Sequence, residues 1–211
     1  MPPRKAPTRA ESQARTRELI LDTAERLFLA KGLHDTKVAE IAAAADRTVG
    51  SIYANFPSKE ALCQAVLERF YGNTFAELTA NALAPGQPLG ANLDALDAWW
   101  RTLGSNTQLT LLVAEFMLVA RRNPDQFGSV IGTLEFIKTT AQAALLAQLD
   151  TPDPNTTARV EQAVTAILST GIGLAIGQAS TLVDTDASAQ ILSDTARIWA
   201  ARAGLPGADE V

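Results

Sequence analysis

The chain has 211 residues, of which 47% are apolar, and it carries a formal net charge of −5. This length fits one domain, or a small domain joined to a larger one, and the apolar share is high enough to bury a core, which excludes a disordered chain. The single cysteine, Cys63, excludes an internal disulfide framework, and no apolar segment with a cleavage site follows the N-terminal residues, so we expect a soluble cytoplasmic protein.

Charge is unevenly distributed along the chain. Residues 1–62 hold ten Lys or Arg against eight Asp or Glu, a net charge of +2, whereas residues 63–211 hold eight against fifteen, a net charge of −7. Within residues 1–17 the basic side chains face only Glu11, which gives this N-terminal arm a charge of +4; they are Arg4, Lys5, Arg9, Arg15 and Arg17. Such an arm is either a solvated tail or a segment that seeks phosphate groups.

The first two predicted helices follow this arm. Apolar residues recur at three- and four-residue spacing from Leu19 to Phe28, and Gly32 follows with Lys31 in the last turn. We therefore expect the first helix to end near Gly32. The hydroxyl of Thr36 is suited to cap the next helix, whose apolar face covers about two turns.

A third short helix and a long fourth helix are predicted next. Thr48 is a good N-cap for the third helix, and Pro57 stops it because proline cannot continue the hydrogen-bond ladder. Ser58 then caps the fourth helix, which we expect to run from Lys59 to about Leu83.

Two short helices joined by a tight turn form the pattern of a helix-turn-helix. The major groove of DNA admits a helix whose outer side chains are short or can bond to base edges and phosphates. Gly50 removes a side chain where the backbone could approach DNA, and Ser51, Tyr53 and Asn55 carry hydrogen-bonding groups. Lys59 begins the next helix, where a cation is unfavourable to the helix dipole, so a phosphate partner would relieve it.

At these residues the sequence resembles the TetR family of one-component transcriptional repressors. The resemblance runs from about Arg15 to Val66, through "LILDTAERLFLAKGLHDTKVAEIAAAADRTVGSIYANFPSKEALCQAV". The positions that fit without gaps are Gly32, Thr36, Ile41, Ala42, Gly50, Tyr53, Phe56, Lys59, Glu60, Ala61 and Leu62. It implies an all-α fold of about nine helices, with an N-terminal three-helix helix-turn-helix headpiece and a C-terminal helical domain that binds a small molecule and dimerises.

The resemblance also implies a division of the chain and a set of contacts. We expect a basic arm at 1–17, a DNA-binding domain at 18–62, a ligand-binding and dimerisation domain at 63–205 and a tail at 206–211. The implied phosphate contacts are Thr36, Thr48, Tyr53, Asn55 and Lys59. The implied base-facing residues are Arg47, Val49, Gly50 and Ser51. The implied partners are a palindromic double-stranded DNA operator, a small-molecule effector and a second copy of the chain, paired through the last two long helices.

The chain departs from the family pattern in the turn and near the end of the third helix. Family members usually have Gly-Val-Ser where this chain has Asp46, Arg47 and Thr48, and a histidine where it has Asn55. Asp46 still suits the turn because Asp tolerates the left-handed conformation. Arg47 must reach outward, either to a guanine or phosphate or to Asp46 or Glu40.

The remainder of the chain is also predicted to be helical. Helix-ending clusters at 84–90, 121–128 and 150–157 divide it, and the final helix is expected at about 186–203. The residues proposed to line an effector pocket are Trp99, Trp100, Leu112, Glu115, Phe116, Phe136 and Gln178, although for each single apolar residue the sequence favours an ordinary core. Because Trp99 and Trp100 are adjacent, they point about 100° apart and cannot share one narrow face.

Glu115 is the polar exception in the apolar segment "LTLLVAEFMLVA". No Lys or Arg lies three or four residues away, so a buried Glu115 needs a partner from another helix or from a ligand. The alternatives are an ion pair with Arg101 or Arg121, a cationic ligand, or plain exposure.

Residues 162–183 contain no charged residue, which is about the length of a transmembrane helix. The segment is rich in Gln, Ser and Thr and has no basic cluster at either end, so we interpret it as a packed helix and expect no membrane span. Gly173 and Gly177, with Ser169 one turn earlier, form a flat strip suited to close helix packing within the domain or across a dimer.

An enzyme is the main rival class. The chain has one histidine, His34, and one thiol, Cys63, and neither has a catalytic partner visible in the sequence. Metal-ligand spacing and a Gly-rich phosphate loop are also absent from the sequence, so we expect no catalysis, metal or cofactor. The sequence favours a ligand-responsive repressor, and the alternative is a helical small-molecule-binding or scaffold protein with a degenerate headpiece.

Overall fold

The computed structural model describes residues 8–82, 88–104, 106–149 and 152–205, and within them every regular element is a helix. The helices are α1 (Arg9–Asp35), α2 (Val38–Ala44), α3 (Val49–Asn55), α4 (Lys59–Ala82), α5 (Leu89–Gly104), α6 (Thr107–Ala120), α7 (Pro124–Leu146), α8 (Pro154–Ala179) and α9 (Thr185–Ala203). The expected all-α architecture is confirmed.

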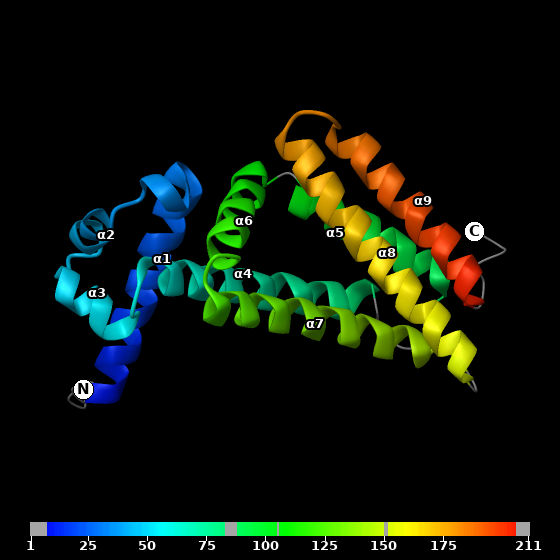
Figure 1. Ribbon diagram of the computed structural model, residues 1–211, viewed down its shortest axis with the longest axis horizontal. Helices are drawn as coiled ribbons and strands as arrows, with labels where there is room; N and C mark the ends of the chain where they lie inside the picture. Colours follow the sequence, from blue (N-terminus) through cyan, green and yellow to red (C-terminus); the bar gives the residue numbers. More distant parts are fainter. Residues whose placement is uncertain (1–7, 83–87, 105, 150–151, 206–211) are drawn as a thin grey trace, which may run out of the picture.

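The helices divide between two ends of an elongated molecule. Helices α1, α2 and α3 gather at one end, while α5, α8 and α9 form a bundle at the other (Figure 1). The long helix α4 leaves the first group and runs toward the bundle, with α7 beside it and α6 standing between α1 and the bundle (Figure 1). Helix α4 therefore links the helix-turn-helix to the rest of the chain.

One hydrophobic core holds the N-terminal helices together, and we call it the headpiece core. Its fully buried side chains include Ile20 and Phe28 of α1, Ile41 of α2 and Ile52 of α3. Helix α4 contributes Leu62, Cys63, Val66 and Leu67. Burial raises the pKa of the Cys63 thiol to about 12, with a smaller contribution from the charges of Glu115 and Glu60, so the thiol stays protonated and unreactive at neutral pH.

Helix α6 belongs to the same core although it lies about 80 residues farther along the chain than α1. Leu109, Leu112, Phe116 and Ala120 are all buried against the headpiece core. They recur at three- and four-residue spacing, which places them on one face of the helix. The apolar packing of the headpiece therefore continues past the expected domain boundary at residue 62, into α4 and α6.

The second end of the molecule has two smaller cores. One joins α5, α8 and α9 through Leu89, Leu93, Val160, Val164 and several alanines. The other surrounds Trp100, which packs with Ala189 and Leu192 and donates its indole N–H to the hydroxyl of buried Ser188 at 2.8 Å. Trp100 also lies 3.5 Å from the position that a Cβ on Gly171 would take, so α5 and α8 are in close contact.

The N-terminal boundary differs from the expected one. Helix α1 begins at Arg9, because Thr8 caps it and Glu11 accepts the Thr8 N–H in a reciprocal capping box. Residues 9–17 of the expected arm are therefore a helical extension of α1, and residues 1–7 lie outside the described residues. As predicted, the regular helix breaks at Gly32, whose φ of 79° is non-helical, although one further turn continues to Asp35.

Two boundaries in the C-terminal part also fall within segments singled out from the sequence. Helix α7 starts at Pro124, inside the expected break at 121–128, because proline is tolerated in the first turn of a helix. Helix α8 ends at Ala179, within the uncharged segment 162–183. By length and composition alone α8 could cross a membrane, as could α5 and α6 taken together as one bent span, but the core helices of soluble proteins meet the same criteria.

Candidate nucleic-acid interface

Helix α3 presents an open face to solvent. Its N-cap is Thr48, as predicted, whose hydroxyl accepts the Ser51 N–H at 3.1 Å. Ile52 is buried in the headpiece core on the inner side, whereas Val49 and Tyr53 are 40% and 49% exposed on the outer side. A Cβ on Gly50 would meet only the Thr48 hydroxyl, at 3.8 Å, so another molecule could approach the backbone there.

The turn before α3 adopts the conformation expected of it. Asp46 has a φ of 52°, which confirms the left-handed residue predicted for this position. The Arg47 guanidinium donates to the Asp46 carbonyl at 2.7 Å and the side chain is exposed. Of the alternatives for Arg47, the structure shows the local contact with Asp46, and an exposed guanidinium beside α3 still has donors for a DNA partner.

The C-terminal end of α3 is held by α1. The Asn55 side chain donates to the Ser51 carbonyl at 2.8 Å, within its own helix. The Arg17 guanidinium donates to the Asn55 carbonyl at 3.3 Å and lies 4.2 Å from the centre of the Phe56 ring. Arg17 therefore ties the N-terminal extension of α1 to the recognition helix, a role that we did not predict; its position near a helix C-terminus depends on tertiary structure.

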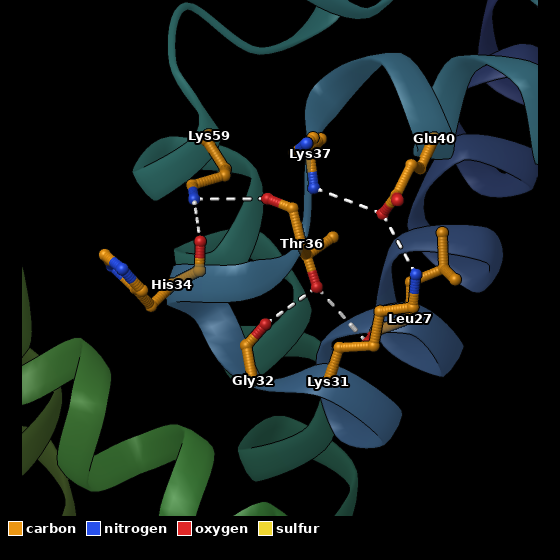
Figure 2. Close-up of polar contacts among 8 residues, drawn as sticks. All are labelled: Leu27, Lys31, Gly32, His34, Thr36, Lys37, Glu40 and Lys59. Carbon is orange, nitrogen blue, oxygen red and sulfur yellow. Dashed lines mark hydrogen bonds and ion pairs between the residues drawn. The ribbon is translucent and has the colours of Figure 1, made fainter.

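Thr36 lies inside the headpiece rather than at its surface. The residue is 1% exposed, and its hydroxyl donates to the Gly32 carbonyl at 2.7 Å and approaches the Leu27 carbonyl at 3.3 Å (Figure 2). The prediction that Thr36 caps α2 is wrong, because Lys37 occupies the N-cap position. In this conformation the Thr36 hydroxyl has no proton left for a phosphate.

Glu40 closes the first turn of α2 in place of a Thr36 cap. Its carboxylate accepts the Lys37 N–H at 3.4 Å and pairs with Lys31 of α1 at 3.1 Å (Figure 2). The hydrogen bond from Lys31, with that from Lys37, holds the pKa of Glu40 below its ordinary value. Since both partners are exposed, the pair contributes little to stability but fixes α2 on α1.

The Lys59 ammonium lies among backbone carbonyls and not in open solvent. It donates to the carbonyls of Leu33 at 2.7 Å, His34 at 3.2 Å and Thr36 at 3.2 Å. Figure 2 shows the contacts to His34 and Thr36. Lys59 is therefore favourable at the C-terminal end of α1, where carbonyls carry negative charge. The expectation that it needs a phosphate partner is wrong for this conformation.

A shallow hollow on the headpiece surface lies between α2, α3 and the start of α4. It is lined by His34, Thr36, Lys37, Val38, Tyr53, Pro57, Ser58, Lys59 and Glu60. The side chains of Lys37, His34 and Tyr53 supply hydrogen-bond donors to this lining, whereas the Lys59 ammonium is occupied by backbone carbonyls. Ser58 also caps α4, as predicted, because its hydroxyl accepts the Ala61 N–H at 3.0 Å.

The residues predicted to line an effector pocket do not gather in one place. Leu112 and Phe116 are buried in the headpiece core, Trp100 lies in the small core with Ser188, and Phe136 is 64% exposed on α7. Trp99 is half-buried and packs against the same small core, with its ring tilted by 48° to that of buried Trp100. The remaining predicted residue, Gln178, is half-buried on α8.

The partners of Glu115 are backbone groups of α1. Its carboxylate accepts the Leu33 N–H at 2.7 Å and the His34 N–H at 3.2 Å. Arg101, one of the proposed ion-pair partners, instead pairs with Asp97 and Asp186. The structure thus gives Glu115 a role that lay outside the alternatives of arginine, cationic ligand and exposure.

Two buried amide side chains in the C-terminal part stand out among the described residues. Both amide atoms of Asn92 and both of Gln178 are buried and have no hydrogen-bond partner within the described protein atoms. Asn92 is 6% exposed and lies on α5 between Leu89 and Leu93. Because an unpaired buried amide is costly, these groups mark positions where a bound molecule could supply the missing partners. We did not single out Asn92 from the sequence.

Comparison with known proteins agrees with this geometry. Residues 20–66 match the family described as bacterial regulatory proteins, tetR family. A TetR-like transcriptional regulator from Rhodococcus sp. RHA1 has a solved structure similar to 94% of this chain and 100% of that chain, with a TM-score of 0.61 and 25% identity. This chain belongs to the TetR family.

Curated relatives match part of the chain. The uncharacterized regulator YuxN of Bacillus subtilis (strain 168) is 43% identical over 61 residues, which is 29% of this chain and 21% of YuxN. The regulator AcrR of Shigella flexneri is 42% identical over 83 residues, or 39% of this chain and 38% of AcrR. The chain thus spans less than half the length of these curated relatives. The SmeT–triclosan complex covers 89% of this chain and 90% of SmeT, at 22% identity and a TM-score of 0.64, which shows a shared fold.

Proposed function

We propose that this TetR-family protein is a soluble cytoplasmic transcriptional repressor that binds a palindromic DNA operator as a homodimer. The observation that carries the proposal is the outer face of α3, where Val49, the open backbone at Gly50 and Tyr53 face solvent. A solvent-facing helix with small and hydrogen-bonding side chains suits the major groove. The intact caps of α3 and α4 argue against the alternative of a degenerate headpiece.

The contacts proposed for DNA follow from which residues are exposed and which side chains still have a free hydrogen-bond donor. Arg47, Val49, Gly50 and Ser51 would face bases. The Thr48 hydroxyl and the Tyr53 phenol would approach phosphates, together with Asn55 and the donors around the hollow beside α2. Lys59 and Thr36 would act by holding the backbone of this region in place, because their own donors are occupied.

A homodimer through α8 and α9 is supported by apolar side chains that these helices leave uncovered. Ile172 and Ile176 are more than half exposed on α8, as is Ile198 on α9, and Ile191 is 45% exposed. On α8 they lie at helical spacing with Gly173, which has nothing within 4 Å of its Cβ position. Two copies that pair through such a strip would present two headpieces to the two halves of a palindrome.

Release by a small, largely apolar effector in the C-terminal part is the second element of the proposal. The partnerless amide of Asn92 lies on α5 between the core residues Leu89 and Leu93 and would orient such a ligand, and the partnerless amide of Gln178 on α8 is a second candidate. SmeT, a protein of the same fold, is known in complex with triclosan. By linkage, a ligand that favours an altered headpiece spacing must weaken operator binding, and DNA must weaken ligand binding by the same factor.

The test is fluorescence anisotropy with duplexes obtained by in vitro selection and with DNA from around the protein's own gene, at several salt concentrations. Specific binding with a steep negative dependence on salt is expected. Arg47→Ala should lower specificity at one base position of each half-site, by about 1–3 kcal/mol if it contacts a base edge. Failure of the wild-type protein to select any duplex would contradict the proposal.

A matched control separates base recognition from net charge. Arg159→Ala removes the same charge from an exposed position of α8, where the guanidinium donates to the Thr156 hydroxyl of its own helix at 3.0 Å. It should leave the preferred sequence unchanged. If both variants lose affinity equally on all duplexes, Arg47 contributes charge alone.

A further inference from the structure

The backbone segment 33–36, which follows Gly32, is bonded to side chains from two sides. From α6, the Glu115 carboxylate accepts the N–H groups of Leu33 and His34 at 2.7 and 3.2 Å. From α4, the Lys59 ammonium donates to the carbonyls of Leu33, His34 and Thr36 at 2.7, 3.2 and 3.2 Å. A carboxylate thus accepts hydrogen bonds from the N–H groups of this segment, and an ammonium group donates hydrogen bonds to its carbonyls.

Gly32 makes room for this arrangement. Its φ of 79° and ψ of 171° turn the chain so that the next two N–H groups leave the regular helical ladder. A Cβ at Gly32 would lie 2.6 Å from one Glu115 carboxylate oxygen and 2.9 Å from the other. The carboxylate therefore rests against the bare glycine backbone, and both the conformation and the space require glycine.

The contact that Glu115 makes with α1 is polar, unlike the contacts of its neighbours on α6. It is the only charged residue of α6, and its neighbours Leu112 and Phe116 meet the headpiece core through apolar packing. Interlocking apolar side chains hold the two helices together, but the hydrophobic effect itself has no direction, so it defines the angle between them less sharply than directed bonds do. Charge-assisted hydrogen bonds to two consecutive N–H groups define one position and one angle.

We propose that Glu115 is the positioning residue through which α6 fixes the angle of the headpiece, with Lys59 holding the opposite side of the same backbone segment. This inference rests on the proposed DNA-binding function and identifies the contact by which the C-terminal part acts on it. Because Thr36 leads directly into α2, a displacement of α6 carries the 33–36 segment and the helix-turn-helix with it. Loss of the carboxylate leaves the headpiece attached by packing, with a less sharply defined angle.

The discriminating experiment measures preference for half-site spacing. The best palindrome selected by the wild-type protein is prepared with its half-sites moved closer together or farther apart by one and two base pairs. The wild-type protein should prefer one spacing. Glu115→Ala should reduce that preference by about tenfold while keeping the half-site sequence that it prefers. Glu115→Gln, which retains one neutral acceptor oxygen, should fall between the two.

Controls separate positioning from loss of stability. Asp94→Asn makes the same charge change at an exposed carboxylate of α5 and should leave the spacing preference intact. Thermal unfolding of each variant shows whether it folds. If Glu115→Ala weakens binding by the same factor at every spacing, Glu115 is only structural and the inference is overturned.

A measurement without DNA covers the case in which the proposed function itself fails. A spin label on Ala44→Cys, at an exposed position of α2, reports the distance between the two headpieces of a dimer, since buried Cys63 does not react. Glu115→Ala should broaden this distance distribution and speed hydrogen exchange at the Leu33 and His34 amides. If neither the distribution nor the exchange rates change, the inference is wrong whether or not the protein binds DNA.

Discussion

The headpiece and the C-terminal bundle are both helical, yet they are held together in different ways. The headpiece core is built mainly from large side chains such as Phe28 and Ile52. The bundle relies on small residues, with Ala163, Ala189 and Ala196 among its buried positions. It also contains the unpaired amides of Asn92 and Gln178.

This contrast separates a region whose packing specifies one arrangement from a region held by fewer specific contacts. Large interlocking side chains specify one arrangement, so the headpiece positions α3 reproducibly. Small side chains let helices approach closely but hold fewer specific contacts, which suits a region that changes its shape when a ligand or partner binds. The family match over residues 20–66 lies within α1 to α4, the helices that build most of the headpiece core.

The largest effect is expected for Trp100→Ala, which tests whether one large residue organises the small-residue bundle. Trp100 is 4% exposed and bonded to Ser188, so its loss should reduce the free energy of unfolding by about 3–5 kcal/mol. Urea denaturation followed by circular dichroism measures this change. Ser188→Ala should cost less, about 1–3 kcal/mol, because it leaves only the indole N–H unpaired.

The result also shows how separate the two regions are. All three tryptophans lie in the C-terminal part, so their fluorescence reports the bundle, whereas circular dichroism reports every helix. If Trp100→Ala makes the two transitions diverge, the headpiece core survives loss of the bundle. Coincident transitions with an unchanged midpoint would show that Trp100 does not organise this core.

An intermediate effect is expected for Gly32→Ala at the junction of the two regions. Alanine would be strained at this positive φ, and its Cβ would collide with Glu115. The backbone strain alone should lower the free energy of unfolding by about 1–3 kcal/mol. The midpoint of urea denaturation measures the loss. An unchanged midpoint would mean that the backbone relaxes without cost.

Gly50→Ala is the matched control for that substitution. Gly50 is helical and its Cβ position is open, so alanine should raise stability by about 0.5–1 kcal/mol. The same change should weaken operator binding, because a methyl group would then lie between α3 and DNA. Stability and DNA affinity should therefore move in opposite directions at Gly50 and fall together at Gly32.

The smallest effect concerns pH and Cys63 in the headpiece core. Because its folded pKa is raised to about 12 from an ordinary value of 9.0, the unfolded chain releases the proton first as pH rises. The stabilisation is complete below pH 9 and is lost toward pH 12, with about 1 kcal/mol lost between pH 8 and pH 10. Cys63→Ala should lack this part of the pH dependence when denaturation midpoints are compared. An identical dependence in both proteins would show that Cys63 does not contribute.

Local chemistry explains which features could be predicted from the sequence. The caps Thr48 and Ser58 and the left-handed Asp46 depend on atoms within three or four residues, so their sequence signals suffice. The outward face of α3 follows in the same way from the burial of Ile52.

Contacts between distant residues explain the features that the sequence did not reveal. Lys59 bonds a carbonyl 26 positions away, and Glu115 bonds an N–H 82 positions away. Nothing in the residues around Glu115 indicates a backbone partner, since an isolated acid in an apolar helix equally suggests an arginine or a ligand. Thr36 was misassigned for a related reason, because a threonine before a helix signals a cap unless the tertiary fold turns its hydroxyl inward.

The participation of α6 in the headpiece core bears on how such proteins can be recombined. A chimaera that joins residues 1–62 to the effector domain of another regulator would separate Leu62, Phe28 and their neighbours from Leu112 and Phe116. The graft would expose an apolar surface, or would need a foreign α6 with matching side chains and a carboxylate opposite Gly32. A transferable DNA-reading module from this chain therefore consists of the first four helices together with one face of the sixth.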